Sequence, residues 1–338
     1  MYQPIGVIYS ITPWNFPVII PIQQNVQGML AGNTVLNKPA PSCPQIGLAV
    51  AQIFADAGLA EQYQPTLAST EHTELVIGHP HVAGVTFTGS CGAGKIVAAL
   101  AGKYMKKASF ELGGSDPFIV LEDADLAKAV QIAVNIRLVN AGQVCISPKR
   151  MIIAEALYEK FKEELLTTLR ARLDSPAKLG PMARSDLLAG LKKQVQETID
   201  AGAKVVFGDT EQLKEQQAEG QGNFFSPVVL EDVAPSNPGF HYEFFGPVFV
   251  LYRVEGDKEA VSLANSVEYG LGGAVFSQDE ERAQKVAMEV ETGSMTINAP
   301  FFPHFALPFG GTKASGYGRE GGVHGFHEFT NVKTVAIP

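Results

Sequence analysis

Short apolar runs rich in β-branched residues alternate with longer stretches of helical spacing along almost the whole chain. The runs predict strands at residues 5–11, 34–36, 82–88, 117–121, 150–154, 203–207, 247–254, 273–276 and 294–298. The spacing of apolar residues between them predicts helices at residues 44–57, 93–104, 125–138, 157–172, 184–201, 258–266 and 280–291. This alternation predicts an α/β fold with largely parallel sheets.

Three stretches suggest how the chain is divided. Gly113 and Gly114 follow a strand-like run at 108–112, and such a pair allows the backbone to cross between two packed domains. The polar stretch 211–222 is predicted to be a surface loop. Residues 326–337 follow a glycine-rich run and predict a terminal strand, of a kind that often pairs with a neighbouring subunit.

Composition narrows the class of protein. The 338 residues are 46% hydrophobic, which excludes wholesale disorder, and 26 Lys and Arg against 35 Asp and Glu give a net charge of −9. This acidic balance disfavours binding to nucleic acid or to an anionic membrane. The apolar start lacks a basic leader and is interrupted by prolines, so neither a signal peptide nor a membrane span is expected. Three cysteines without CxxC spacing argue against disulfides or a zinc site and fit a reducing cytoplasm.

Residues 89–95, GSCGAGK, resemble a phosphate-binding loop that follows a strand and opens a helix. Ile96 stands where a nucleotide-hydrolysing loop needs a hydroxyl group for magnesium, so that chemistry is disfavoured. The glycines and Ser90 would still offer free N–H groups to an anion such as the pyrophosphate of a dinucleotide. A tight strand-to-helix turn without a ligand explains the same residues equally well.

Several side chains have both a structural and a chemical interpretation. Cys145 and Cys91 are each either a small core residue or a reactive thiol, and spacing alone does not choose between them. Glu111, at the end of an apolar strand before two glycines, is either a paired structural acid or a base. Asn15, between prolines, either holds its turn together or points its amide at a developing oxyanion. Arg137 on its helix is either a structural cation or the partner of a substrate carboxylate.

Seven motifs occur in one order over nearly the whole chain and together resemble the aldehyde dehydrogenase superfamily. They are PWNFP at 13–17, GNT with KPA at 32–40, FTGS at 87–90, ELGG at 111–114, GQVC at 142–145, EFFGP at 243–247, and PFGG with SGYGRE at 308–320. Within the superfamily, the stretches 111–121, 137–145 and 180–184 look most like bacterial succinate-semialdehyde dehydrogenases.

The resemblance implies oxidation of an aldehyde to a carboxylic acid with NAD or NADP. Cys145 would be the nucleophile that forms a thiohemiacetal and then a thioester. Asn15 and the backbone N–H of Cys145 would stabilise the oxyanion, and Glu111 would activate the water that releases the acid. The residues implied in cofactor binding are Thr12, Pro13, Trp14, Lys38, Ser42, Gly89, Ser90, Leu112, Gly113, Glu243 and Phe245.

The resemblance also implies a domain plan and a homo-oligomer, a dimer or tetramer. Residues 1–6 would be a remnant of an oligomerisation hairpin, 7–112 a partial Rossmann-type cofactor domain, 113–325 an α/β catalytic domain and 326–338 an oligomerisation strand. Met1 falls within that hairpin, so the cofactor domain would lack a layer and expose apolar surface. A truncated pseudoenzyme that serves as a structural or regulatory subunit is therefore the alternative.

The cofactor preference depends on one position. Many NAD-preferring members of the superfamily place a Glu three residues after the lysine of Lys38, and this chain has Pro41 there. A carboxylate at that point accepts a hydrogen bond from the ribose 2′-OH and repels a 2′-phosphate, and proline does neither. With Ser42 as an added donor, a modest preference for NADP is expected.

Overall fold

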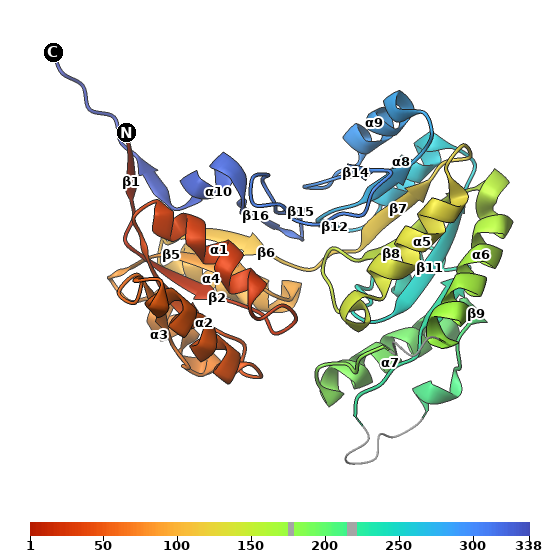
Figure 1. Cartoon of the computed structure of the whole chain (residues 1–338), viewed down its shortest axis with the longest axis horizontal. Coiled ribbons are helices and arrows are strands. Elements are labelled where there is room, and N and C mark those ends of the chain that lie inside the picture. Colours follow the sequence, from red (N-terminus) through yellow and green to blue (C-terminus); the bar gives the residue numbers. More distant parts are fainter. Residues whose placement is uncertain (175–178, 215–221) are drawn as a thin grey trace. The chain divides into compact units, whose positions relative to one another are not determined.

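The computed structural model describes residues 1–174, 179–214 and 222–338, which form two compact units. The first unit contains residues 1–113 and 302–338, and the second contains residues 114–301. The two stretches of the first unit, red to orange and blue in Figure 1, are joined by strand pairing. No helix in the described part of the chain is long and apolar enough to cross a membrane.

The first unit is built on a six-stranded sheet in the order β16-β6-β5-β2-β3-β4. The strands are β2 (Val7–Ile11), β3 (Thr34–Lys38), β4 (Tyr63–Pro65), β5 (Val82–Thr88), β6 (Lys107–Glu111) and β16 (Gly316–Tyr317). All neighbours pair in parallel except β16, which is antiparallel to β6. The chain builds outward from β2 on one side through β3 and β4, and on the other side through β5 and β6. The strand order therefore reverses between β2 and β5, as in doubly wound folds.

Helices cover both faces of this sheet. Apolar residues of α1 (Ile19–Leu30) and α2 (Pro44–Asp56) pack against Ile8 and Val35 on one face. Those of α3 (Thr73–Ile77) and α4 (Cys91–Lys103) pack against Tyr9 and Val85 on the other. The sequence pattern did not predict α1, because prolines interrupt it. Pro21 lies in the first turn of α1, where a backbone N–H has no partner within the helix and proline is tolerated.

The second unit holds a seven-stranded sheet in the order β14-β13-β7-β8-β11-β10-β9. Its strands are β7 (Asp116–Val120), β8 (Pro148–Ala154), β9 (Lys204–Phe207), β10 (Val228–Glu231), β11 (Val248–Val254), β13 (Ala274–Phe276) and β14 (Thr296–Ile297). Only the edge strand β9 runs antiparallel to its neighbour. Central strands of a parallel sheet are buried on both faces, and β7 and β8 are buried at every position.

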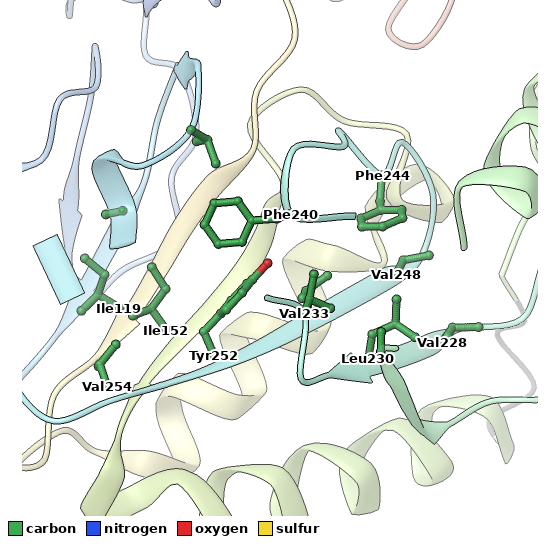
Figure 2. Packing of buried hydrophobic residues seen from close by; sticks show 14 of the residues in the cluster. Ile119, Ile152, Val228, Leu230, Val233, Phe240, Phe244, Val248, Tyr252 and Val254 are labelled. Atoms are coloured by element: carbon green, nitrogen blue, oxygen red, sulfur yellow. The ribbon is translucent and has the colours of Figure 1, made fainter. Parts of the chain in front are cut away.

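Alternate residues of these strands belong to two separate cores. Ile119, Ile152 and Tyr252 face α7 (Ser185–Asp200), α8 (Asp257–Asn265) and α9 (Glu280–Glu289), in the cluster of Figure 2. The residues between them face α5 (Leu126–Arg137) and α6 (Glu155–Asp174). The period of two along a strand thus places helices on both sides of the sheet.

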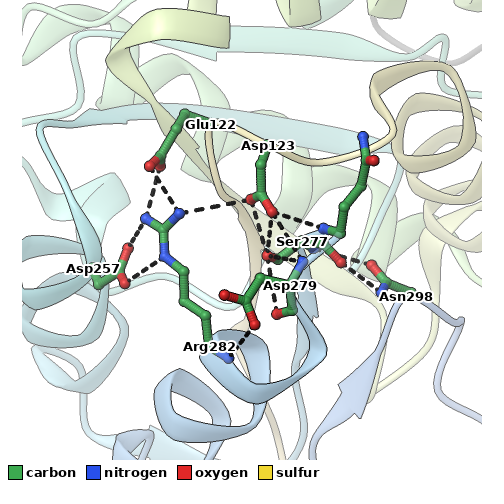
Figure 3. A network of polar contacts seen from close by, with 8 residues as sticks. Glu122, Asp123, Asp257, Ser277, Asp279, Arg282 and Asn298 are labelled. Carbon is green, nitrogen blue, oxygen red and sulfur yellow. Dashed lines mark hydrogen bonds and ion pairs between the residues drawn. The ribbon is translucent and has the colours of Figure 1, made fainter.

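Paired charges close the carboxyl edge of the second sheet (Figure 3). Arg282 of α9 donates two hydrogen bonds of 2.8 Å to Glu122, which follows β7, and also binds Asp257 at the start of α8. Ser277, after β13, donates to Asp123. These carboxylates are thus paired with partners from the same unit, and the contacts join the ends of β7 and β13 to α8 and α9.

The ends of the chain differ from the expected plan. Residues 302–325 belong to the first unit, because β16 pairs with β6. The catalytic domain was expected to extend to residue 325. Residues 326–328 end helix α10 (Gly322–Glu328), and the strand that follows, β17 (Thr330–Val332), is short. It pairs with β1 (Tyr2–Pro4) of the same chain.

Candidate active site

The candidate residues of the first unit gather at one edge of its sheet. Asn15 follows β2, Lys38 ends β3, Ser90 follows β5 and Glu111 ends β6. Because these four strands are parallel neighbours, all four residues lie at the carboxyl edge, on both sides of the point where the strand order reverses. Ligands of open α/β sheets bind at this place.

The amine of Lys38 is well suited to a ligand. The residue is 4% exposed, and its Nζ is not among the buried polar atoms that lack a partner in the described residues. Burial lowers the pKa of Lys38, because desolvation penalises the charged form. An ammonium group offers three N–H donors, which suit a ribose hydroxyl or a phosphate oxygen.

The segment that opens α4 contains Ser90, which was expected to bind the phosphates of the cofactor. Ser90 caps the helix, and its Oγ accepts a hydrogen bond from the N–H of Ala93 at 3.3 Å. Gly94 allows the helix to approach Leu112 closely, since a Cβ there would lie 2.4 Å from the leucine side chain. The helix N-terminus thus lies beside Leu112 and Gly113, two other residues expected to bind the cofactor.

Glu111 is the last residue of β6 and is 6% exposed. The antiparallel β16 pairs with it at Gly316, and Ser315 holds the following turn by donating from Oγ to the carbonyl of Gly113 at 2.6 Å. The C-terminal stretch of the chain therefore fixes the backbone around this carboxylate.

In the second unit, the nucleophile candidate follows a strained turn. Asn140, Ala141 and Gly142 have φ of 50°, 55° and 76°, and only glycine adopts such values without cost. Gly142 also packs so closely on Gly246 that a Cβ would lie 2.4 Å from its carbonyl. Cys145, partly buried, comes three residues later, before β8. Strain of this kind is typical of functional sites.

Buried polar side chains hold this turn. Gln143 accepts from the N–H of Ala183 and donates to the carbonyl of Asn140, both at 2.9 Å. Arg137 donates to the carbonyls of Val248, Gly142 and Phe244 and to Ser147 Oγ, at 2.6–3.2 Å.

Arg137 has no exposed surface, and four of the five N–H groups of its guanidinium donate to acceptors from its own unit. This geometry disfavours the expected contact with a substrate carboxylate, because the group has no exposed surface. Arg137 instead joins the turn before Cys145 to the segment that leads into β11.

Glu243 lies at the same edge of the second sheet as Cys145, since both precede parallel strands, β11 and β8. Its Oε1 accepts from the N–H of Gly114 at 3.0 Å and lies 3.8 Å from Nζ of Lys149. Burial raises the pKa of Glu243, and Lys149 opposes that rise. Phe245, two residues after Glu243, is partly exposed.

Two residues at this edge were not singled out from the sequence. Lys149 is completely buried, and Asp116 is buried with Oδ1 accepting from the N–H of Gly272 at 3.1 Å. Asp116 Oδ2 has no hydrogen-bond partner among the described residues, and burial raises the pKa of this carboxyl to about 6. The described residues contain no group of three or more His, Cys, Asp or Glu arranged to hold a metal ion.

Comparison with known proteins gives the family of the chain. The model of the aldehyde dehydrogenase family matches residues 1–335. The chain is 45% identical to the succinate-semialdehyde dehydrogenase [NADP(+)] of Deinococcus radiodurans, over 99% of this chain and 70% of that protein. It is 40% identical to the succinate semialdehyde dehydrogenase [NAD(P)+] of Escherichia coli, over 99% of this chain and 72% of that protein.

Solved structures give the same result. The succinic semialdehyde dehydrogenase of Streptococcus pyogenes, determined in complex with NADP+, superimposes with a TM-score of 0.94 at 35% identity, over all of this chain and 74% of that one. The Gox0499 structure superimposes with a TM-score of 0.93 at 42% identity, over all of this chain and 74% of that one. The chain belongs to the aldehyde dehydrogenase family.

Proposed function

We propose that this chain oxidises an aldehyde to a carboxylic acid with NAD(P)+, through a covalent intermediate on Cys145. The observation that carries the proposal is the placement of Cys145 after a strained turn held by buried Arg137 and Gln143, in a chain of this family. Strain that surrounding side chains maintain is expected where a nucleophile must keep a fixed geometry.

In the proposed reaction, the Sγ of Cys145 forms a bond to the aldehyde carbon. The amide of Asn15 and the backbone N–H of Cys145 stabilise the oxyanion of the thiohemiacetal. The bound NAD(P)+ supplies the acceptor for the hydride. Glu111 then removes a proton from the water that attacks the thioester, which releases the acid and restores the thiol.

Residues of both units are assigned to the cofactor in this proposal. Lys38 would bind the ribose or phosphate oxygens, Ser90 and the start of α4 would hold the pyrophosphate, and Glu243 and Phe245 would position the nicotinamide ribose. The exposed Pro41 and Ser42 follow Lys38, so we expect NADP to be preferred by on the order of tenfold or less, or about 1.4 kcal/mol.

We propose succinate semialdehyde as the substrate, on the strength of the names of the relatives. No residue is assigned to its carboxylate, since Arg137 is enclosed. Comparing kcat/KM for succinate semialdehyde and for butanal, which lacks the carboxylate, tests this part. Equal values for the two aldehydes would refute the substrate assignment while leaving the reaction class intact.

The test of the reaction is formation of NAD(P)H, followed by absorbance, with wild type, Cys145→Ala and Cys91→Ala. Cys145→Ala should abolish turnover, and Cys91→Ala should retain most of it. An equal loss in both variants would contradict the role of Cys145. A folded wild-type protein that binds cofactor without turnover would favour the pseudoenzyme alternative.

A further inference from the structure

Lys149 makes an unusual set of contacts for a lysine. Its side chain is 1% exposed, and its Nζ donates to three backbone carbonyls, those of Val144 at 3.0 Å, Cys145 at 2.6 Å and Ser147 at 3.2 Å. An ammonium group has three N–H donors, so these carbonyls satisfy it completely. All three belong to the short segment that contains Cys145.

The geometry of the peptide bond gives these contacts a consequence. The carbonyl of Val144 and the N–H of Cys145 belong to one planar, trans peptide group, in which they point in opposite directions. The carbonyl of Cys145 is related in the same way to the N–H of Ile146. By holding both carbonyls, Lys149 turns both N–H groups away from itself. It also polarises them, since a hydrogen bond to the carbonyl strengthens the N–H of the same group as a donor.

We infer that Lys149 is a positioning residue for the oxyanion donor of this enzyme: its ammonium fixes and polarises the peptide group whose N–H belongs to Cys145. The inference deepens the proposed function, because it rests on that N–H facing the oxyanion. Lys149 touches neither substrate nor cofactor in this account, and it acts through the backbone.

The charges around Lys149 stabilise its ammonium group in this buried position. Burying an ammonium costs several kcal/mol unless it is paired. Glu243 lies 3.8 Å away, and Asp116 contributes a second nearby carboxylate, whereas Arg137 opposes the charge. Burial lowers the pKa of Lys149, and the two carboxylates counteract this. A chain that needed only to fill this space would place an apolar residue here at a lower cost in desolvation.

The test compares two reactions of the same thiol, in a background where Cys43→Ser and Cys91→Ser leave Cys145 as the only cysteine. With p-nitrophenyl acetate, Sγ bonds to the carbonyl carbon through an oxyanion and p-nitrophenolate leaves, giving an acetyl thioester. With iodoacetamide, Sγ displaces iodide and no oxyanion forms. Both rates are measured for the full chain by mass spectrometry, without cofactor, in Lys149→Met and in the exposed control Lys160→Met.

Lys149→Met should slow acylation tenfold or more and alkylation less than threefold, because loss of a single oxyanion donor slows reactions by about 10²–10³-fold and here the donor is misaligned rather than removed. Lys160→Met should change neither rate. Equal slowing of the two reactions, or no slowing, would overturn the inference. Acylation that depends on Lys149 in a protein that oxidises neither succinate semialdehyde nor butanal with NAD(P)+ would support the inference and refute the proposed function.

Folding is controlled with a second variant. Lys149→Met leaves Glu243 without its buried partner, so Lys149→Met/Glu243→Gln removes both charges together. The double variant should show the same selective loss of acylation as the single one. If neither variant gives a folded protein by circular dichroism, Lys149 serves the folding of the second unit as a whole and the specific role is overturned.

Discussion

Replacing Arg137 by Met distinguishes a structural cation from a substrate-binding one. The guanidinium donates four hydrogen bonds to buried acceptors on three segments of the second unit. Hydrogen bonds from a charged donor contribute about 1.5–3 kcal/mol each, or about 6–12 kcal/mol together. The substitution also removes the free-energy cost of burying the charge of the guanidinium, which offsets several kcal/mol of this loss. We therefore expect Arg137→Met to lower the free energy of unfolding by about 3–5 kcal/mol.

The matched control is Arg253→Met in the same unit. Arg253 makes ion pairs of 2.8 Å and 2.6 Å with Glu155 and Glu159, but its side chain is 43% exposed. Exposed pairs of this kind contribute about 1 kcal/mol or less, because water screens them. The two arginines differ in burial, and Arg253 has two carboxylates and the ring of Tyr158 as partners in place of buried carbonyls, so the expected losses differ severalfold.

Urea unfolding of the two units can be followed separately. The only tryptophan, Trp14, lies in the first unit, so its fluorescence reports that unit. Far-ultraviolet circular dichroism reports both units. Arg137→Met should move the dichroism transition to lower urea and leave the fluorescence transition nearly unchanged. A stable Arg137→Met protein with a raised KM for succinate semialdehyde, and an unchanged KM for butanal, would refute this reasoning.

Three further predictions concern the chemistry and its surroundings. Glu111→Gln should slow thioester hydrolysis more than acylation, so rapid mixing should show an NAD(P)H burst before a slow steady state. Slow hydride transfer without a burst would contradict the role of Glu111. In cofactor titrations, Pro41→Glu should weaken NADP binding by charge repulsion and leave the affinity for NAD unchanged or improved. Equal weakening of both cofactors would mean that this position does not contact the 2′ group. Burial raises the pKa of Asp116 from 3.8 to about 6, so the folded state binds this proton more tightly than the unfolded state does. As the pH rises from about 4 to 6, this carboxyl therefore lowers the free energy of unfolding by up to about 3 kcal/mol. Asp116→Asn should remove that dependence in urea unfolding, and an unchanged pH profile would argue against it.

The regular elements were largely predictable because their signals are local. The strand at 82–88 has the bounds predicted from its apolar run, and the helix predicted at 125–138 differs from α5 by one residue at each end. The helix α1 was missed because prolines at its start break the expected pattern, although proline is harmless in a first turn. The strand β10 was missed because three apolar residues followed by Glu231 carry little signal.

The roles of the buried cations were harder to predict. Arg137 follows Val130, Ala133 and Val134 at helical spacing on the buried face of α5, so the periodicity did contain a sign that it lies in the core. Lys149 carries no such sign, because a lysine before an arginine at a strand start is usually exposed. Its burial depends on three carbonyls presented by the segment after a left-handed turn, and sequence spacing does not encode that turn.

The order in which the chain can fold follows from which segments make up the first unit. The second unit is one continuous segment, whereas the first needs both ends of the chain, and the hydrogen bond between Met1 and Lys333 joins residues 332 positions apart. During synthesis, the nascent chain can complete the second unit while β6 still lacks β16 and β1 still lacks β17. The usual order, in which the N-terminal part folds first, is thus not available for a complete first unit. Closing such long loops carries an entropic cost that local contacts avoid, so the first unit is expected to set the folding rate.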